Sequence, residues 1–239
     1  MLYFIVPFKS VKASLSWVDV CGLLQSTLIS ICQQTSTDFR VIVVCTELPM
    51  IDYHHSSIDF LQVETDLTVI NRRQDKLNKI KAGFEFAKRY NPSHYMVVDS
   101  DDLISNKIVE FVSQNIEHEG WIFNHGYVHE VAQNYFYVVR SGFYNHCGTC
   151  AILKGHLLEM LFLDKRGWFD HEIKTFKALK IELPFLPFVG TIYSSQNGQN
   201  NYANHPLYKR FWFQAKPRFN NLIRFKQITP EIKSEFMIL

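Results

Sequence analysis

The sequence lacks the long apolar run that a membrane-spanning helix needs. No stretch of about 18 uninterrupted apolar residues occurs in the chain, whereas a spanning helix takes about 20. The net charge is only +2 over 239 residues, so the strong positive charge typical of nucleic-acid-binding proteins is also absent. Residues 1–8 are apolar, but they lack a basic lead and reach Pro7 and Lys9 too early for a signal peptide. We therefore expect a cytoplasmic protein with no nucleic-acid partner.

Cysteines are few, and their spacing gives little support for a disulfide framework or a zinc site. The chain has five, an odd number, and Cys147 and Cys150 form a single CxxC pair. A CxxC without a second pair at zinc-like spacing is weak evidence for a metal site or a redox pair. We expect buried, reduced thiols, with the zinc and redox alternatives left open.

The sequence does contain an alternation of strand and helix patterns. Its 47% apolar and 15% aromatic content suits a folded globular protein. Apolar, β-branched runs predict strands at residues 2–6, 39–45, 60–64 and 95–98. Apolar residues at helical spacing predict helices over 23–32 and 75–90. This order predicts an α/β fold with a mostly parallel central sheet flanked by helices.

Three carboxylates directly follow the buried strand at residues 95–98. They are Asp99, Asp101 and Asp102. If the chain stays extended, Asp99 and Asp101 share a face, because side chains repeat every second residue. Two such oxygen ligands suit Mg²⁺ or Mn²⁺, with diphosphate oxygens completing the coordination. The alternative is an acidic turn in which Asp102 or Ser105 caps the next helix.

Charged residues also follow the other predicted strands. Lys9 and Glu47 stand just past strand ends, as Asp99 does. In parallel sheets, ligands collect at the carboxyl ends of the strands. We therefore expect these three residues to line one crevice.

A basic segment precedes and enters the helix predicted at residues 75–90. Residues 71–79 read NRRQDKLNK. Cations at a helix start oppose the helix dipole, so the segment does not serve helix stability. Contact with an anion such as a diphosphate would account for it, and a solvated basic face is the alternative.

Taken in order, these segments resemble the nucleotide-sugar glycosyltransferases of the GT-A fold, in particular the family 2-like enzymes. The resemblance rests on IVPFK at 5–9, LQSTLISICQQT at 24–35, DFRVIVV at 38–44 and DSD at 99–101, where that family has its DxD motif. It covers roughly the first 110 residues. It implies a Rossmann-like GT-A fold and a metal-dependent, inverting transfer of a sugar, as in polysaccharide biosynthesis. The implied donor is a nucleoside diphosphate sugar, with a UDP-sugar favoured, and the implied acceptor is a glycan or a lipid-linked glycan.

The resemblance also implies roles for individual residues. Asp99 and Asp101 would hold Mn²⁺ or Mg²⁺, which stabilises the charge of the leaving diphosphate. Glu47 would accept a hydrogen bond from the nucleotide base, although an ordinary surface turn explains it as well. The full set of expected donor contacts is Pro7, Lys9, Glu47, Arg73, Lys76, Lys79, Asp99 and Ser100.

The resemblance places the catalytic base in the second half of the chain. Asp170 follows a Trp-Phe pair that could form an acceptor-binding wall, and it matches the family's carboxylate at the start of a late helix. Glu172 is the reserve, because a single base must reach the acceptor hydroxyl. Alternatives are that Asp170 only caps a helix at 173–179, or that His171 is the base.

A second match in this half is weaker. Residues 191–200 resemble a family loop whose His often completes the metal site, and Asn197 stands at that place. Asn can offer a carbonyl oxygen to Mg²⁺ or Mn²⁺. The loop could instead only bind substrate, for example as a lid.

These patterns divide the chain into three parts. We expect a nucleotide-sugar-binding half at residues 1–110, an acceptor-binding and catalytic half of the same domain at 111–205, and a C-terminal basic-aromatic extension at 206–239. Mixed rings and cations at 206–226 suit peripheral contact with the inner membrane face. The alternative is that the rings pack on the domain, since Pro217 interrupts any long amphipathic helix.

Two other functions remain open. A sugar-phosphate nucleotidyltransferase builds its site on a similar sheet, but usually has a glycine-rich loop after the first strand, and residues 6–10 contain no glycine. A nucleotide-sugar-binding or glycan-binding module without turnover is the third alternative, and Asn197 in place of His keeps it open.

Overall fold

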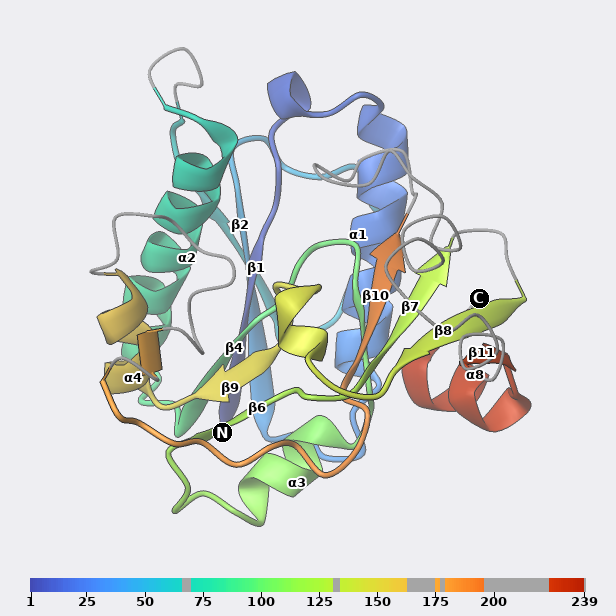
Figure 1. Cartoon of the computed structure of the whole chain (residues 1–239). Coiled ribbons are helices and arrows are strands. Elements are labelled where there is room, and N and C mark those ends of the chain that lie inside the picture. Colours follow the sequence, from blue (N-terminus) through green and yellow to red (C-terminus); the bar gives the residue numbers. More distant parts are fainter. Residues whose placement is uncertain (66–69, 131–133, 163–174, 177–178, 196–223, 239) are drawn as a thin grey trace.

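The protein is built on two β-sheets that share one hydrophobic core (Figure 1). The computed structural model describes residues 1–65, 70–130, 134–162, 175–176, 179–195 and 224–238. Within these residues the first sheet has six strands and the second has five. Short 3-10 helices η1 (Val11–Ala13) and η2 (Phe143–Asn145) lie in the connections.

The first sheet is mostly parallel, as predicted. Its order is β3-β2-β1-β4-β9-β6. The strands are β1 (Leu2–Pro7), β2 (Phe39–Cys45), β3 (Ile58–Gln62), β4 (His94–Val97), β9 (Ala151–Leu153) and β6 (Gly120–Ile122). Strands β1 to β4 pair in parallel, whereas β9 runs antiparallel to both β4 and β6. The start of β9 therefore lies beside the carboxyl end of β4.

Helices cover both faces of this sheet. They are α1 (Trp17–Cys32), α3 (Ile108–Ser113), α2 (Arg72–Lys88) and α4 (Gly155–Phe162). On one face Phe4 of β1 belongs to the same buried cluster as Leu28 of α1, and on the other Ile5 belongs with Ile80 of α2. A strand buried on both faces is apolar at every position, which explains why β1 reads as an unbroken apolar run.

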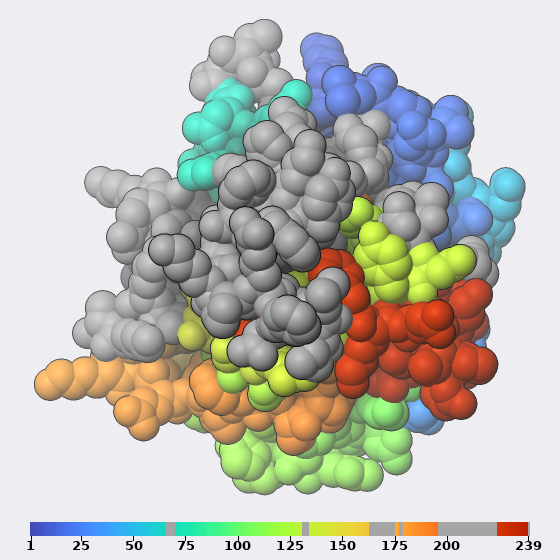
Figure 2. Space-filling model, turned by 45° about the vertical axis from the view of Figure 1, so that its right-hand side comes forward, coloured from blue at the N-terminus to red at the C-terminus, as the bar shows by residue number. Residues whose placement is uncertain are grey.

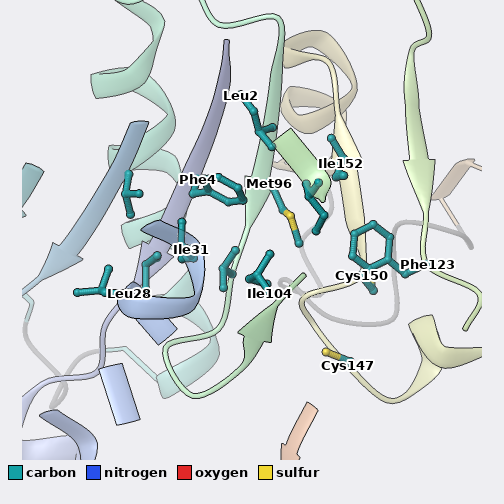
Figure 3. Close-up of a cluster of buried hydrophobic side chains, with 14 of the residues drawn as sticks. Leu2, Phe4, Leu28, Ile31, Met96, Ile104, Phe123, Cys147, Cys150 and Ile152 are labelled. Atoms are coloured by element: carbon teal, nitrogen blue, oxygen red, sulfur yellow. The ribbon is translucent and has the colours of Figure 1, made fainter. Parts of the chain in front are cut away.

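The core extends across neighbouring strands of this sheet. Figure 3 shows Phe4, Met96 and Ile152, from β1, β4 and β9, in one layer of side chains. All three are fully buried. The strand ends that carry polar residues are thus held on a close-packed base.

The second sheet has no counterpart in the sequence predictions. Its order is β11-β8-β7-β10-β5. The strands are β5 (Leu103–Ile104), β7 (Gly126–Glu130), β8 (Tyr135–Val139), β10 (Thr191–Ser195) and β11 (Phe225–Gln227). Residues 191–200 were predicted as a loop, but the first five of them form β10, which pairs with β5 and β7.

The C-terminal end of the chain completes this second sheet. Strand β11 pairs with β8, and helix α8 (Pro230–Phe236) buries Phe236 against Phe136 and Ile192. In Figure 2 this red segment lies against the yellow-green part of the chain. Residues 225–238, the described part of the predicted C-terminal extension, thus pack into the second sheet.

Two helices begin earlier than the apolar spacing predicts, because a capping side chain fixes the start of each helix several residues before that spacing begins. Helix α1 begins at Trp17, where the Ser16 side chain accepts from a backbone N–H of the first turn. Helix α2 begins at Arg72 and not at residue 75, because the Asn71 side chain accepts from two backbone N–H groups of its first turn. Such capping places helix starts before the first apolar residue of the pattern.

The predictions for the thiols agree with the structure. All five cysteines lie in the described residues, and each is buried with a free thiol.

Among the helices that the structure describes, none has the length and apolar character needed to cross a membrane.

Candidate active site at the carboxyl end of the first sheet

The loops that follow β1, β2 and β4 meet at one edge of the first sheet. They carry Lys9, Glu47 and Asp99. Glu47 Oε2 accepts from the Val11 backbone N–H at 3.1 Å, which joins the first two loops. Burial lowers the pKa of Lys9, and the nearby carboxylates of Asp101 and Asp99 oppose this effect. The structure thus brings these residues to one edge of the sheet.

The acidic segment is a turn and not an extended strand end. Strand β4 ends at Val97, and the backbone N–H of Asp102 donates to the carbonyl of Asp99 at 3.1 Å. The condition under which Asp99 and Asp101 would share a face, an extended chain, is therefore not met, and the alternative of an acidic turn is observed. We call residues 99–102 the acidic turn. It does not cap the next helix, because the N-cap of α3 is Lys107.

An ion pair joins the acidic turn to helix α2. Lys76 Nζ lies 2.5 Å from Asp99 Oδ1, and the two side chains are 27% and 22% exposed. Burial alone would lower the pKa of Lys76, but the charges of Asp99, Asp101 and Asp102 together raise it above its ordinary value. Lys76 is therefore a cation held among three acidic side chains.

Gly148 allows this pair to approach the loop before β9. A Cβ atom at this position would lie 2.9 Å from Asp99 Oδ2 and 3.3 Å from Lys76 Nζ. Both contacts are tighter than a side chain normally makes, so a larger residue at this position would displace the ends of the Asp99 and Lys76 side chains.

Asp102 is the buried member of the turn. Its side chain is fully buried, and its Oδ2 accepts from the Thr149 hydroxyl at 2.6 Å and from the Cys147 thiol at 3.2 Å. Its Oδ1 accepts from the Ser194 backbone N–H of β10 at 3.2 Å. Burial and the nearby Asp101 and Asp99 raise the pKa of Asp102 well above its usual value. Asp102 therefore links the acidic turn to β10 and to the loop before β9.

Tyr193 of β10 also faces the acidic turn. Burial raises the pKa of its hydroxyl, and the charges of Asp102 and Asp101 raise it further. The second sheet thus contributes to the surroundings of the acidic turn.

Sequence reasoning did not assign Thr149, Cys147 or Tyr193 to the site. They reach it through the antiparallel pairing of β9 with β4 and through β10, which are contacts between distant segments. In the sequence, the motif at 147–150 was interpreted only through its two cysteines. In the structure, Gly148 and Thr149 are the residues that lie against Asp99.

The predicted donor contacts from α2 differ in exposure. Arg73 is exposed on the first turn, and Lys76 pairs with Asp99. Lys79 is 1% exposed, and its ammonium donates to the Phe8 carbonyl at 2.9 Å and to Asp75 Oδ2 at 3.0 Å. Lys79 is thus enclosed between α2 and the end of β1, and both of these hydrogen bonds go to protein atoms.

The remaining predicted site residues differ in burial, and several lie outside the described residues. Pro7 is the buried last residue of β1 and pairs with Val44, so it shapes the start of the loop. Ser100 is half-buried within the acidic turn. Asp170, Glu172, Asn197 and the membrane-contact segment up to residue 223 lie outside the described residues.

Asp99 and Asp101 have the donor chemistry for a hard divalent cation. Mg²⁺ is usually held by one or two carboxylates, with substrate phosphates and water supplying the other oxygens. Among the described residues, no group of three His, Cys, Asp or Glu side chains is arranged to hold a metal.

Comparisons with known proteins give structural likeness only. No family model matches the chain, and no curated protein matches it in sequence. The chain is similar to residues 1–349 of S. aureus TarS, with a TM-score of 0.53, 14% identity and 81% of this chain covered. It spans 60% of the length of that TarS chain.

Two other solved structures resemble the chain with lower TM-scores. The 2-C-methyl-D-erythritol 4-phosphate cytidylyltransferase (IspD) of Francisella tularensis has a TM-score of 0.48 at 14% identity, over 82% of this chain and 91% of that one. A 4-diphosphocytidyl-2C-methyl-D-erythritol synthase has 0.47 at 13%, over 89% and 96%. At these scores neither adds to the argument. The likeness to TarS establishes the fold, and the predicted Rossmann-like GT-A-type architecture is confirmed.

Proposed function

We propose that the protein is a metal-dependent glycosyltransferase of the inverting type. It moves a sugar from a nucleoside diphosphate sugar, with a UDP-sugar favoured, to a glycan or lipid-linked acceptor in polysaccharide biosynthesis. The observation that carries the proposal is the acidic turn at the carboxyl end of β4, where Asp99 and Asp101 lie within electrostatic reach of Lys9 and Lys76.

The mixed charges at this edge suit a diphosphate that binds with a divalent cation. Asp99 and Asp101 would hold Mn²⁺ or Mg²⁺, which supplies Lewis-acid stabilisation of the leaving diphosphate. Lys9 and Lys76 supply positive charge beside the same position. Arg73 is exposed on the first turn of α2 and adds a cation at the rim.

Lys76 has a second use in this arrangement. An ammonium has three N–H donors, and one is directed to Asp99 Oδ1. Lys76 can therefore hold the Asp99 carboxylate in place and still donate to a phosphate oxygen. Glu47, at the end of β2, stands where it could accept from the nucleotide base, and its bond from the Val11 N–H fixes its position.

The acceptor side of the proposal rests on the sequence. Asp170 is the proposed general base, with Glu172 in reserve, and Asn197 is the proposed third metal ligand. A cytoplasmic location, with peripheral contact at the inner membrane face through residues 206–226, belongs to the same proposal, because a lipid-linked acceptor would lie there.

Nucleotidyl transfer remains the alternative activity on this fold. The loop at residues 7–10 after β1 contains no glycine, which counts against the glycine-rich phosphate loop of those enzymes. A binding module without turnover is the third candidate.

A product assay separates the three. The protein is incubated with Mn²⁺ and either UDP-sugars with a glycan acceptor or nucleoside triphosphates with sugar phosphates. Release of UDP from one UDP-sugar, lost in Asp101→Ala and in Asp170→Asn, is the expected result. Release of pyrophosphate would overturn the proposal in favour of nucleotidyl transfer. Donor binding with neither product would support the binding module.

A further inference from the structure

One buried hydroxyl contacts both ends of the acidic turn. Thr149 Oγ1 accepts from the Asp99 backbone N–H at 2.9 Å and donates to Asp102 Oδ2 at 2.6 Å. Thr149 is fully buried. Asp101 lies between the two contacted residues, so the hydroxyl of Thr149 fixes both ends of the turn that carries Asp101.

Asp102 extends this contact to two other segments. Its carboxylate also accepts from the Cys147 thiol of the same loop and from the Ser194 N–H of β10. A buried hydrogen-bonding group that loses its partner costs more free energy than the bond itself contributes. The conformation of the acidic turn therefore depends on groups outside it.

We propose that Thr149 is a positioning residue, whose hydroxyl holds the acidic turn in the conformation that presents Asp99 and Asp101 to a divalent cation and its diphosphate. The proposal rests on the proposed function for its ligand. The geometry on which it stands is the paired contact of Thr149 with Asp99 and Asp102. Residues that orient metal-binding carboxylates typically change metal affinity about 10- to 100-fold when they are replaced.

Thr149→Val and Thr149→Ser form the test pair, because Val keeps the shape without the hydroxyl and Ser keeps the hydroxyl. The readout is the ratio of UDP affinity with Mn²⁺ to UDP affinity with EDTA, measured by calorimetry. We expect this ratio to fall about tenfold or more in Thr149→Val and to stay near the wild-type value in Thr149→Ser.

Ser30→Ala is the matched control for a merely structural effect. Ser30 is also fully buried, and its Oγ accepts from the Ile104 backbone N–H at 3.1 Å. Its loss should lower the melting temperature and leave the Mn²⁺ dependence of UDP affinity unchanged. An undiminished ratio in Thr149→Val would overturn the proposal, as would an equal fall in Ser30→Ala.

Hydrogen exchange tests the same proposal without a ligand. Loss of both hydrogen bonds of the Thr149 hydroxyl should speed amide exchange over residues 99–102 about tenfold or more in Thr149→Val, and not in Thr149→Ser or Ser30→Ala. If wild-type protein binds no nucleotide, the proposed function fails, and faster exchange at the turn still supports the role of Thr149. Unchanged exchange in Thr149→Val would overturn that role whatever the nucleotide result.

Discussion

Lys76 and Asp99 form an ion pair across the gap between helix α2 and the loop after β4, with Nζ 2.5 Å from Oδ1. The sequence predicted Asp99 as a metal ligand and Lys76 as a cation that contacts the diphosphate. Asp101 and Asp102 add negative charge around the same ammonium. A ligand at this edge of the sheet therefore meets a carboxylate that is already hydrogen-bonded and oriented.

Replacing Lys76 tests whether this cation serves the ligand. In Lys76→Met we expect UDP affinity to fall by about 1.5–3 kcal/mol, the range for hydrogen bonds to charged groups. Titration calorimetry measures it. Lys88→Met, at the far end of the same helix, is the control, because Lys88 pairs with Glu85 and Glu159 on the surface. Equal affinities in the two variants would contradict a phosphate-binding role for Lys76.

Lys79 should behave in the opposite way. Its ammonium is buried against Asp75, and removing one partner of a buried ion pair costs about 3–5 kcal/mol of unfolding free energy. Urea denaturation of Lys79→Met, Asp75→Leu and the double variant should show a large coupling between the two positions. Folded Lys79→Met should bind UDP normally. A selective loss of UDP affinity without loss of stability would restore Lys79 to the binding site.

Gly148 provides a steric test of the space beside Asp99. In Gly148→Ala the new Cβ would press on Asp99 Oδ2 and Lys76 Nζ, and we expect Mn²⁺-dependent UDP affinity to fall about tenfold, as for other residues that orient a metal ligand. Gly22→Ala is the control. Among the described residues, nothing lies within 4 Å of a Cβ built at Gly22. Ala is favoured over Gly in a helix by up to about 1 kcal/mol. An unaffected Gly148→Ala variant would show that the site tolerates displacement of the pair.

The surroundings of His94 predict how the free energy of unfolding depends on pH. Burial lowers the pKa of its ring, Nε2 donates to the His118 carbonyl at 2.8 Å, and Nδ1 is buried without a hydrogen-bond partner among the described residues. Because the folded pKa lies below the unfolded value, the contribution of neutral His94 is present above the unfolded pKa and is lost as pH falls through the folded pKa.

We therefore expect wild-type stability to fall from pH 7 to pH 5 more steeply than that of His94→Gln, by up to about 1.4 kcal/mol per pH unit. Gln retains an N–H donor and does not titrate. Urea unfolding at several pH values measures the slopes. Parallel slopes for the two proteins would show that His94 does not control this dependence.

The sequence predicted the parts of the fold that depend on local pattern. Strands β1, β2 and β4 were found because burial on both faces makes them continuously apolar. The second sheet was missed because strands such as β5 and β10 are stabilised by pairing with segments far away in the sequence. The carboxylates of the site were recognised from their place after β4. The sequence left an extended chain and an acidic turn open, and the hydrogen bond between Asp99 and Asp102 shows that the turn forms.

The same limit applies within the site. Lys76 and Lys79 look alike in the sequence, and burial against Asp75 separates their roles. Thr149 reaches Asp99 because β9 runs antiparallel to β4. No local pattern reports that pairing, so a scan for motifs could not have found the hydroxyl.

Nucleotide binding tests the central claim most directly. UDP, GDP, CDP and TDP are titrated by calorimetry into wild-type protein and Asp101→Ala, each with Mn²⁺ and with EDTA. We predict that one nucleotide, with UDP favoured, binds more tightly with Mn²⁺, and that Asp101→Ala abolishes this difference. Binding that is indifferent to Mn²⁺ would remove the metal role from Asp101, and no binding of any of the four would contradict the account.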